Sequence, residues 1–232
     1  MGRNNNVNFK ICIIEMGNSP RIDIINDFNL LLNDYMVKFI EIGVLDKLSE
    51  KDLPNLLTTK KNEKTIITKY RDNITCYLKK DEVGKIIENL IHKIDPRKFN
   101  KIVIACDEDY RNILGKMDNI VLPLEIMKQY LESQSLKTNN SIVFPTKSQV
   151  KFEREEWCRI LSSPQFLVCD PFSTENFVST IKSLKKSKPD RIILNCFGFT
   201  LEQKRSLEHE LGIPVILPRE LVARHIKQDL AV

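Results

Sequence analysis

The sequence predicts an α/β protein made of two similar Rossmann-like, flavodoxin-like domains, whose parallel sheets face each other across a cleft. Two observations predict this fold. Short apolar runs alternate with amphipathic segments along the chain, which is typical of parallel strands connected by helices. In addition, residues 101–106 repeat residues 191–196 position by position: a basic residue, an apolar run, one small or polar residue and a cysteine.

In the first half we expect strands at residues 9–14, 37–44 and 101–105, because these runs are mostly apolar. Helices are expected at 20–33 and 81–93, where apolar residues recur at helical spacing. Three further elements complete this half: an amphipathic segment at 48–57, a hairpin of strands 65–70 and 74–78, and a short helix that ends at Gly115.

The loop after the first strand is a candidate binding site. Ser19 is predicted to be the N-cap of the following helix, with Pro20 in its first position. The backbone N–H groups of Gly17, Asn18 and Ser19 would then be free to bind a carboxylate or a phosphate. A purely structural turn explains the same residues equally well.

In the second half we expect strands at residues 141–144, 165–169, 191–194 and 213–217, each followed by a helix. The signals for the helix ends are Thr146 with Gln149, Ser173, Thr200 with Gln203, and Gly212. From this order of elements we expect an N-terminal domain of residues 1–118 plus 219–232. A C-terminal domain would comprise residues 119–218.

Composition excludes several classes of function. The 232 residues are 42% hydrophobic and 29% charged, with a net charge of +5. No apolar run approaches the roughly 18 residues of a membrane span, and the start lacks an apolar signal region, so we expect a cytoplasmic protein without a membrane partner. No nucleic-acid motif is present, and we expect no nucleic-acid partner. The three histidines are far apart and the six cysteines form no C-x-x-C pair, so we expect no metal site.

Cys106 and Cys196 are the candidate reactive residues, because each lies at the end of a predicted parallel strand. Cys106 directly follows the strand at 101–105, and Cys196 follows the strand at 191–194 after one residue, Asn195. Ligands gather at that edge of an open α/β sheet. The helix that begins at Thr200 would also favour the thiolate of Cys196 over its thiol. For any one cysteine, a small buried hydrophobic residue is the commoner interpretation, and Cys12 fits it best.

Several motifs, in order and spacing, resemble the AroM family over nearly the whole chain. They lie at residues 17–21, 43–46, 68–73, 195–200, 214–217 and 221–224. The resemblance implies a place in the aspartate/glutamate racemase-like superfamily, whose members have two similar α/β domains and one catalytic cysteine from each. The AroM family itself has no settled biochemical activity.

The resemblance implies that Cys106 and Cys196 act on a small carboxylate without a cofactor, one as thiolate and one as thiol. A homodimer is a further possibility. The substrate-binding residues are then expected to be Gly17, Asn18, Ser19, Arg21, Thr146, Phe197, Gly198 and Thr200.

Three departures from the racemase pattern keep alternatives open. Cys106 is followed by Asp107, Glu108 and Asp109, acids that would raise its pKa and suit a cationic or neutral substrate group. Cys196 is followed by phenylalanine and glycine, and Asn195 replaces the usual aspartate of the AroM motif. The hypotheses are a racemase, epimerase or isomerase that uses both thiols, an enzyme that uses Cys196 alone, and a metabolite-binding protein without catalysis.

Overall fold

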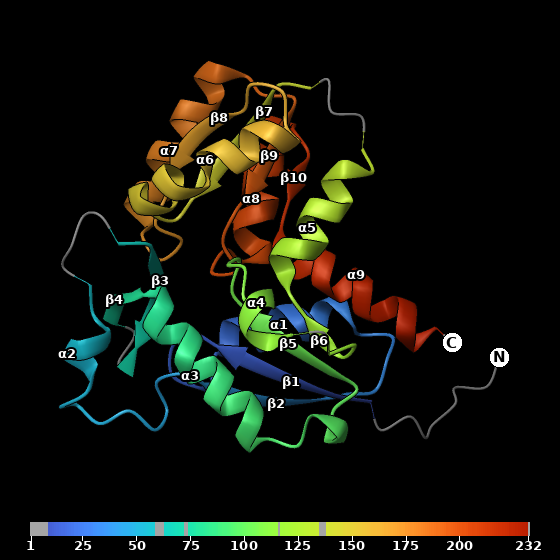
Figure 1. Ribbon diagram of the computed structural model, residues 1–232. Coiled ribbons are helices and arrows are strands. Elements are labelled where there is room, and N and C mark those ends of the chain that lie inside the picture. The colour runs from blue at the N-terminus through green and yellow to red at the C-terminus, as the bar shows by residue number, and fades with distance from the viewer. Residues whose placement is uncertain (1–8, 59–62, 72–73, 116, 135–137, 232) are drawn as a thin grey trace.

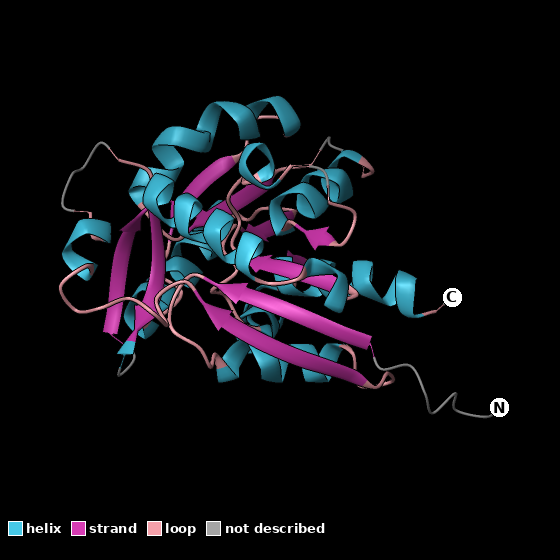
Figure 2. Cartoon of the chain, turned by 60° about the horizontal axis from the view of Figure 1, so that its bottom comes forward, coloured by secondary structure: helices cyan, strands magenta, loops and turns pink. Residues whose placement is uncertain are grey.

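The computed structural model describes residues 9–58, 63–71, 74–115, 117–134 and 138–231 (Figure 1). Within them the chain forms two four-stranded parallel sheets and one separate antiparallel hairpin. Figure 2 shows the hairpin strands standing apart from the larger sheets. The predicted α/β class with two parallel sheets is confirmed.

The first sheet has the strand order β2–β1–β5–β6, with every neighbouring pair parallel. Its strands are β1 (Phe9–Glu15), β2 (Val37–Gly43), β5 (Lys101–Ala105) and β6 (Ile120–Val121). β1 is central and its apolar side chains are buried on both faces, as expected for a parallel strand covered by helices. Since β6 belongs to this sheet, residues 120 and 121 lie with the first half of the chain; the domain boundaries stay a prediction.

Two apolar layers cover this sheet. Alternate residues of β1 and β5, such as Ile13 and Val103, pack against α1 (Ile22–Leu31) and α9 (Pro218–Leu230). The other face packs against α3 (Lys80–Lys93) and the hairpin of β3 (Thr65–Tyr70) and β4 (Ile74–Lys79). The C-terminal helix α9 therefore returns to the first half of the chain, as Figure 1 shows.

The second sheet has the order β10–β9–β7–β8 and is also parallel. Its strands are β7 (Asn140–Phe144), β8 (Gln165–Val168), β9 (Arg191–Leu194) and β10 (Val215–Ile216). One face packs against α5 (Pro123–Glu132) and α6 (Lys147–Ile160), where Trp157 is fully buried. The other face packs against α7 (Thr174–Ser187) and α8 (Leu201–Leu211).

The predicted helix ends in the second half are confirmed. Thr146 and Ser173 accept the expected backbone hydrogen bonds, and Thr200 and Gln203 form a reciprocal capping box. Gly212 ends α8 with a φ of 65°, a left-handed conformation that glycine adopts at little cost. The remaining short elements are α2 (Leu53–Leu56), the 3₁₀ turn Pro96–Lys98 and α4 (Arg111–Leu114). No helix in the described part of the chain is long and apolar enough to cross a membrane.

The predicted start of the first helix is wrong. α1 begins at Ile22, two residues later than expected, and the Ser19–Pro20 peptide bond is cis. Ser19 does not cap the helix, because its backbone N–H and its hydroxyl both donate to the carboxylate of Asp46, at 2.8 and 2.7 Å. The Asn18 N–H donates to the carbonyl of Lys69 at 3.4 Å. These two N–H groups are therefore not free to bind an anion.

Candidate functional site

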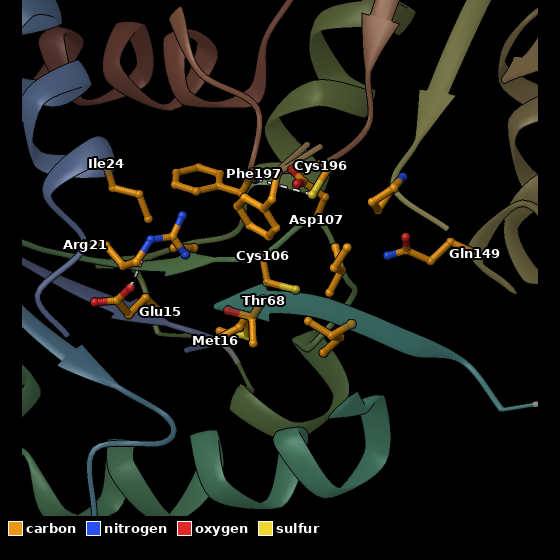
Figure 3. A pocket seen from close by; sticks show the side chains of 16 residues that line it. Glu15, Met16, Arg21, Ile24, Thr68, Cys106, Asp107, Gln149, Cys196 and Phe197 are labelled. Carbon is orange, nitrogen blue, oxygen red and sulfur yellow. Dashed lines mark hydrogen bonds and ion pairs between the residues drawn. The ribbon is translucent and has the colours of Figure 1, made fainter. Parts of the chain in front are cut away.

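A cavity lies where the carboxyl ends of the two sheets meet (Figure 3). Its volume is about 30 Å³, enough for one or two water molecules. Residues from the ends of β1, β5 and β9, from the start of α1 and from hairpin strand β3 line it. The walls thus come from both halves of the chain, at the sheet edge where ligands gather in α/β folds.

Cys106 and Cys196 both line this cavity, one from the loop after each sheet's inner strand. Figure 3 shows their side chains on opposite sides of it. Cys106 is buried, and Cys196 is partly exposed. The other cysteines do not line the cavity: Cys12, Cys76 and Cys169 are buried elsewhere, and Cys158 is exposed. The structure therefore brings together the two cysteines that the sequence singled out.

Three of the eight predicted substrate-binding residues also line the cavity: Arg21, Phe197 and Gly198. The other five, Gly17, Asn18, Ser19, Thr146 and Thr200, lie outside its lining. Their contacts include bonds that shape the backbone nearby. For example, Thr146 caps α6, Thr200 caps α8, and Gly17 passes so close to the hairpin that a Cβ atom there would lie 2.1 Å from the Lys69 carbonyl oxygen. A role for these five in substrate binding stays a prediction.

Burial raises the pKa of the Cys196 thiol, and the charge of Asp107 raises it further. The Gly198 N–H, which donates to Sγ at 3.3 Å, and two arginines act in the opposite direction. The first N–H of helix α8, that of Leu201, donates to Asp27 and not to Cys196. An effect of this helix on the thiol therefore stays a prediction. Without a bound substrate, the thiol is the favoured form of Cys196.

The three acids after Cys106 separate in the fold. Glu108 turns away from the cavity and forms ion pairs with Lys64 at 2.7 Å and Lys80 at 3.2 Å. Asp109 is exposed and accepts the backbone N–H of Arg111. Asp107 alone enters the cavity lining. Burial, followed by the charges of Glu108 and Asp107, raises the pKa of the Cys106 thiol, in the direction that the sequence predicted.

Glu15 also lines the cavity, although no motif in the sequence singled it out. Its carboxyl is 1% exposed, and neither oxygen has a hydrogen-bond partner in the described part of the chain. Burial raises the pKa of Glu15 to about 9, although Arg21, with its Nε 4.0 Å from the carboxylate, lowers it. A signal was present in the sequence, since Glu15 ends the first apolar strand at the edge where ligands bind.

Arg21 is the one cationic residue among the described residues that line the cavity. Its guanidinium binds Asp23 through two hydrogen bonds of 2.8 and 2.9 Å. It also lies over the ring of Phe172, with 5.5 Å between Cζ and the ring centroid. These contacts hold the guanidinium of Arg21 at the wall of the cavity.

A buried polar network lies behind the cavity. Lys64 links Glu108 to Glu153, whose carboxylate is 3.1 Å from the lysine Nζ. Gln149 donates to Glu108, and Asn195 donates to Glu153, at 3.2 Å each. The network therefore connects the start of the hairpin with the two loops that carry the cysteines, since Glu108 follows Cys106 by two residues and Asn195 directly precedes Cys196. Within the described residues, no group of three histidine, cysteine or acidic side chains is arranged to hold a metal ion.

The model of the family described as "AroM protein" matches residues 11–230 of this chain. The chain belongs to the AroM family. The match covers nearly all the elements described above, including both cysteine loops and the first turns of α1 and α8. No curated protein matches the sequence.

Solved structures of the racemase fold resemble this AroM family member over almost its full length. Allantoin racemase from Klebsiella pneumoniae has a TM-score of 0.58 at 12% identity, covering 96% of this chain and 88% of its own. Aspartate racemase from Picrophilus torridus has a TM-score of 0.60 at 12% identity, covering 96% and 94%. A maleate isomerase from Pseudomonas putida S16, solved with maleate, has a TM-score of 0.59 at 12% identity, covering 96% and 93%. At such identities the likeness establishes the fold.

Proposed function

We propose that this AroM family protein is a cofactor-independent racemase, epimerase or isomerase of a small carboxylate, and that Cys106 and Cys196 are its two proton-transferring residues. One observation carries the proposal: two thiols from matching positions of the two sheets line one cavity. A base on one face of a carbon and an acid on the other are what racemisation without a cofactor requires.

Arg21 supports the carboxylate part of the proposal, because its guanidinium presents positive charge at the cavity wall. Maleate, the ligand of the similar isomerase, is a small dicarboxylate. The developing negative charge on the substrate would lie near the Gly198 N–H, which now donates to Cys196. Phe197 and Gly198 are expected to shape the side of the cavity next to this thiol.

The cavity of about 30 Å³ is too small in this structure to hold a carboxylic acid of several carbon atoms. Substrate entry therefore requires one wall to move. Closing over the substrate would exclude water and strengthen the electrostatic interactions of the thiols. The expected homodimer and the cytoplasmic location stay predictions.

The alternative function is a metabolite-binding protein without catalysis. One observation favours it: burial raises the pKa of both thiols, which disfavours the thiolate that a base must form. An enzyme that uses only Cys196 lies between the two hypotheses. Cys196 is the more exposed of the two residues, and its sulfur accepts a hydrogen bond from the Gly198 N–H.

Solvent deuterium incorporation tests the proposal. A pooled panel of small chiral amino, hydroxy and dicarboxylic acids would be incubated in D₂O with the wild type and with Cys106→Ala, Cys196→Ala and Cys158→Ala. Mass spectrometry reads the exchange at carbon. Exchange by the wild type and by Cys158→Ala, whose thiol is exposed and outside the cavity, is expected.

Loss of exchange in both cavity variants would support the two-thiol reaction, and loss in Cys196→Ala alone would support the single-thiol enzyme. Because removal of a proton-transferring group typically costs 10²- to 10⁴-fold, the losses should be large. No exchange by the wild type across the panel, together with a metabolite retained by the purified protein, would establish the binding function instead.

A further inference from the structure

Asp107 is buried at the cavity but takes part in none of the polar networks described above. It is 4% exposed, and neither carboxylate oxygen has a hydrogen-bond partner in the described part of the chain. An unpaired buried carboxyl contributes nothing to folding and costs stability. Its neighbours Glu108 and Asp109, by contrast, have partners.

Asp107 follows Cys106 in sequence but lies beside the other thiol. Figure 3 shows its side chain next to Cys196. Of all charged groups, Asp107 has the largest effect on the Cys196 thiol, and it also acts on Cys106. One carboxyl therefore shares the cavity lining with both sulfurs, and its charge acts on each of them.

The geometry points to Asp107 as the proton partner of Cys196, which accepts the thiol proton to generate the thiolate and later returns a proton to Cys106. This inference rests on the proposed racemase or isomerase reaction. It assigns a task to an acid at a position where this chain departs from the racemase pattern.

The proton balance is complete without a co-reactant. The S–H bond of Cys196 breaks, its proton moves to Asp107, and the electron pair remains on sulfur. The thiolate then takes the proton of the substrate carbon, and the C–H electron pair becomes the carbanion. The Cys106 thiol gives its proton to the opposite face. Finally the proton on Asp107 passes to the Cys106 thiolate, which restores the starting state of all three groups.

The charged groups around Asp107 and Cys196 come from four parts of the fold. Glu153 of α6 and the neighbouring Glu108 raise the pKa of Asp107 beyond the larger effect of burial, and Arg219 of α9 lowers it. The backbone of Phe197 lowers it as well. Around Cys196, Arg219 and the Arg21 guanidinium lower the thiol pKa against burial and Asp107. The raised pKa of the Asp107 carboxyl is closer to the pKa of the Cys196 thiol than an ordinary carboxyl pKa is. A small difference between the two pKa values favours proton exchange between the groups.

Titration of Cys196 tests the inference without a substrate. The thiolate absorbance of Cys196 is obtained as the difference between a protein and its Cys196→Ala counterpart, in the wild-type, Asp107→Asn and Asp109→Asn backgrounds. Two coupled groups lose their protons in two steps, so the wild type and Asp109→Asn should show two steps. Asp107→Asn should show one step, at lower pH than the second wild-type step, because the negative charge is gone.

Exchange measurements complete the test. Asp107→Asn is expected to lower the rate by about 10²-fold or more. Its rate should rise with pH where the wild-type rate is level, because Cys196 must then lose its proton to solvent. Asp109→Asn should match the wild type. An identical one-step titration in wild type and Asp107→Asn would overturn the inference, whether or not a substrate is found. If the wild type titrates in two steps but exchanges no acid of the panel, the coupling of Asp107 to Cys196 is supported and the proposed reaction is rejected.

Discussion

Arg219 and Asp27 form a buried ion pair that joins the two ends of the chain, with 2.7 Å between Nη1 and Oδ2. Arg219, in the first turn of α9, is fully buried; Asp27 lies on α1. The same guanidinium donates from Nε to the carbonyl oxygen of Phe197 at 2.8 Å and binds Asp23 at 2.7 Å. One side chain therefore holds α9, α1 and the loop after Cys196 together.

Replacing Arg219 by methionine is expected to destabilise the protein by about 3–5 kcal/mol, because Asp27 would be left as a buried charge without its partner. Denaturant unfolding followed by circular dichroism measures this loss. Arg224→Met is the matched control on the same helix, where the side chain is 59% exposed and pairs with Glu220. That change should cost less than about 1 kcal/mol. Equal effects of the two variants would contradict the central position of Arg219.

Lys64 holds the hairpin to the network behind the cavity through Glu108 and Glu153. Lys64→Met should lower the free energy of unfolding by about 3 kcal/mol, since two buried carboxylates would each lose a cation. Lys85→Met is the control, because Lys85 is on the surface and, within the described residues, forms an ion pair with Glu82 only. No measurable change is expected there. A Lys64 variant as stable as the wild type would show that the network does not support the hairpin.

Gly17 is predicted to tolerate no side chain. A Cβ atom would lie 2.1 Å from the backbone carbonyl oxygen of Lys69, so the loop and the hairpin would have to separate. Gly17→Ala should therefore cost about 2 kcal/mol. A Cβ atom at Gly84, inside α3, would meet the flexible end of Ile113 at 2.8 Å and, in ordinary contact, the ring of Tyr110 at 3.4 Å. Gly84→Ala should therefore be neutral or stabilising by up to about 1 kcal/mol. Thermal unfolding of both variants compares them, and a stable Gly17→Ala would refute the close approach.

The protonation of Glu15 should make stability fall as pH rises. Burial raises the pKa of Glu15 from 4.5 to about 9 in the folded state, so the folded protein holds a proton that the unfolded chain releases between these values. The stabilisation is complete below pH 4.5 and is lost toward pH 9. This one group contributes a slope of about 1.4 kcal/mol per pH unit.

Glu15→Gln removes the titrating group and keeps the shape of the side chain. The variant should be more stable than the wild type near pH 8, and the difference between the two should shrink toward pH 5. Urea unfolding across this pH range measures it. A constant difference would mean that Glu15 is ionised in the folded protein throughout.

The sequence alone determined the two parallel sheets and the helix ends of the second half. Apolar runs bounded by capping residues specify strands and helices locally, so the strands at 101–105 and 191–194, the capping box at Thr200 and the turn at Gly212 could be read without a structure. The edge at which the two cysteines lie follows from the same local order, because all carboxyl ends of a parallel sheet lie on one side.

Only the tertiary structure decided the partners of the polar side chains. Ser19 has the local signals of an N-cap, but Asp46, 27 residues away, takes both of its donors. The acids after Cys106 look equivalent in sequence, yet only Asp107 enters the cavity, beside the thiol of the other half. Burial and pairing of charges depend on which distant segments pack together, and no pattern of neighbouring residues encodes that packing.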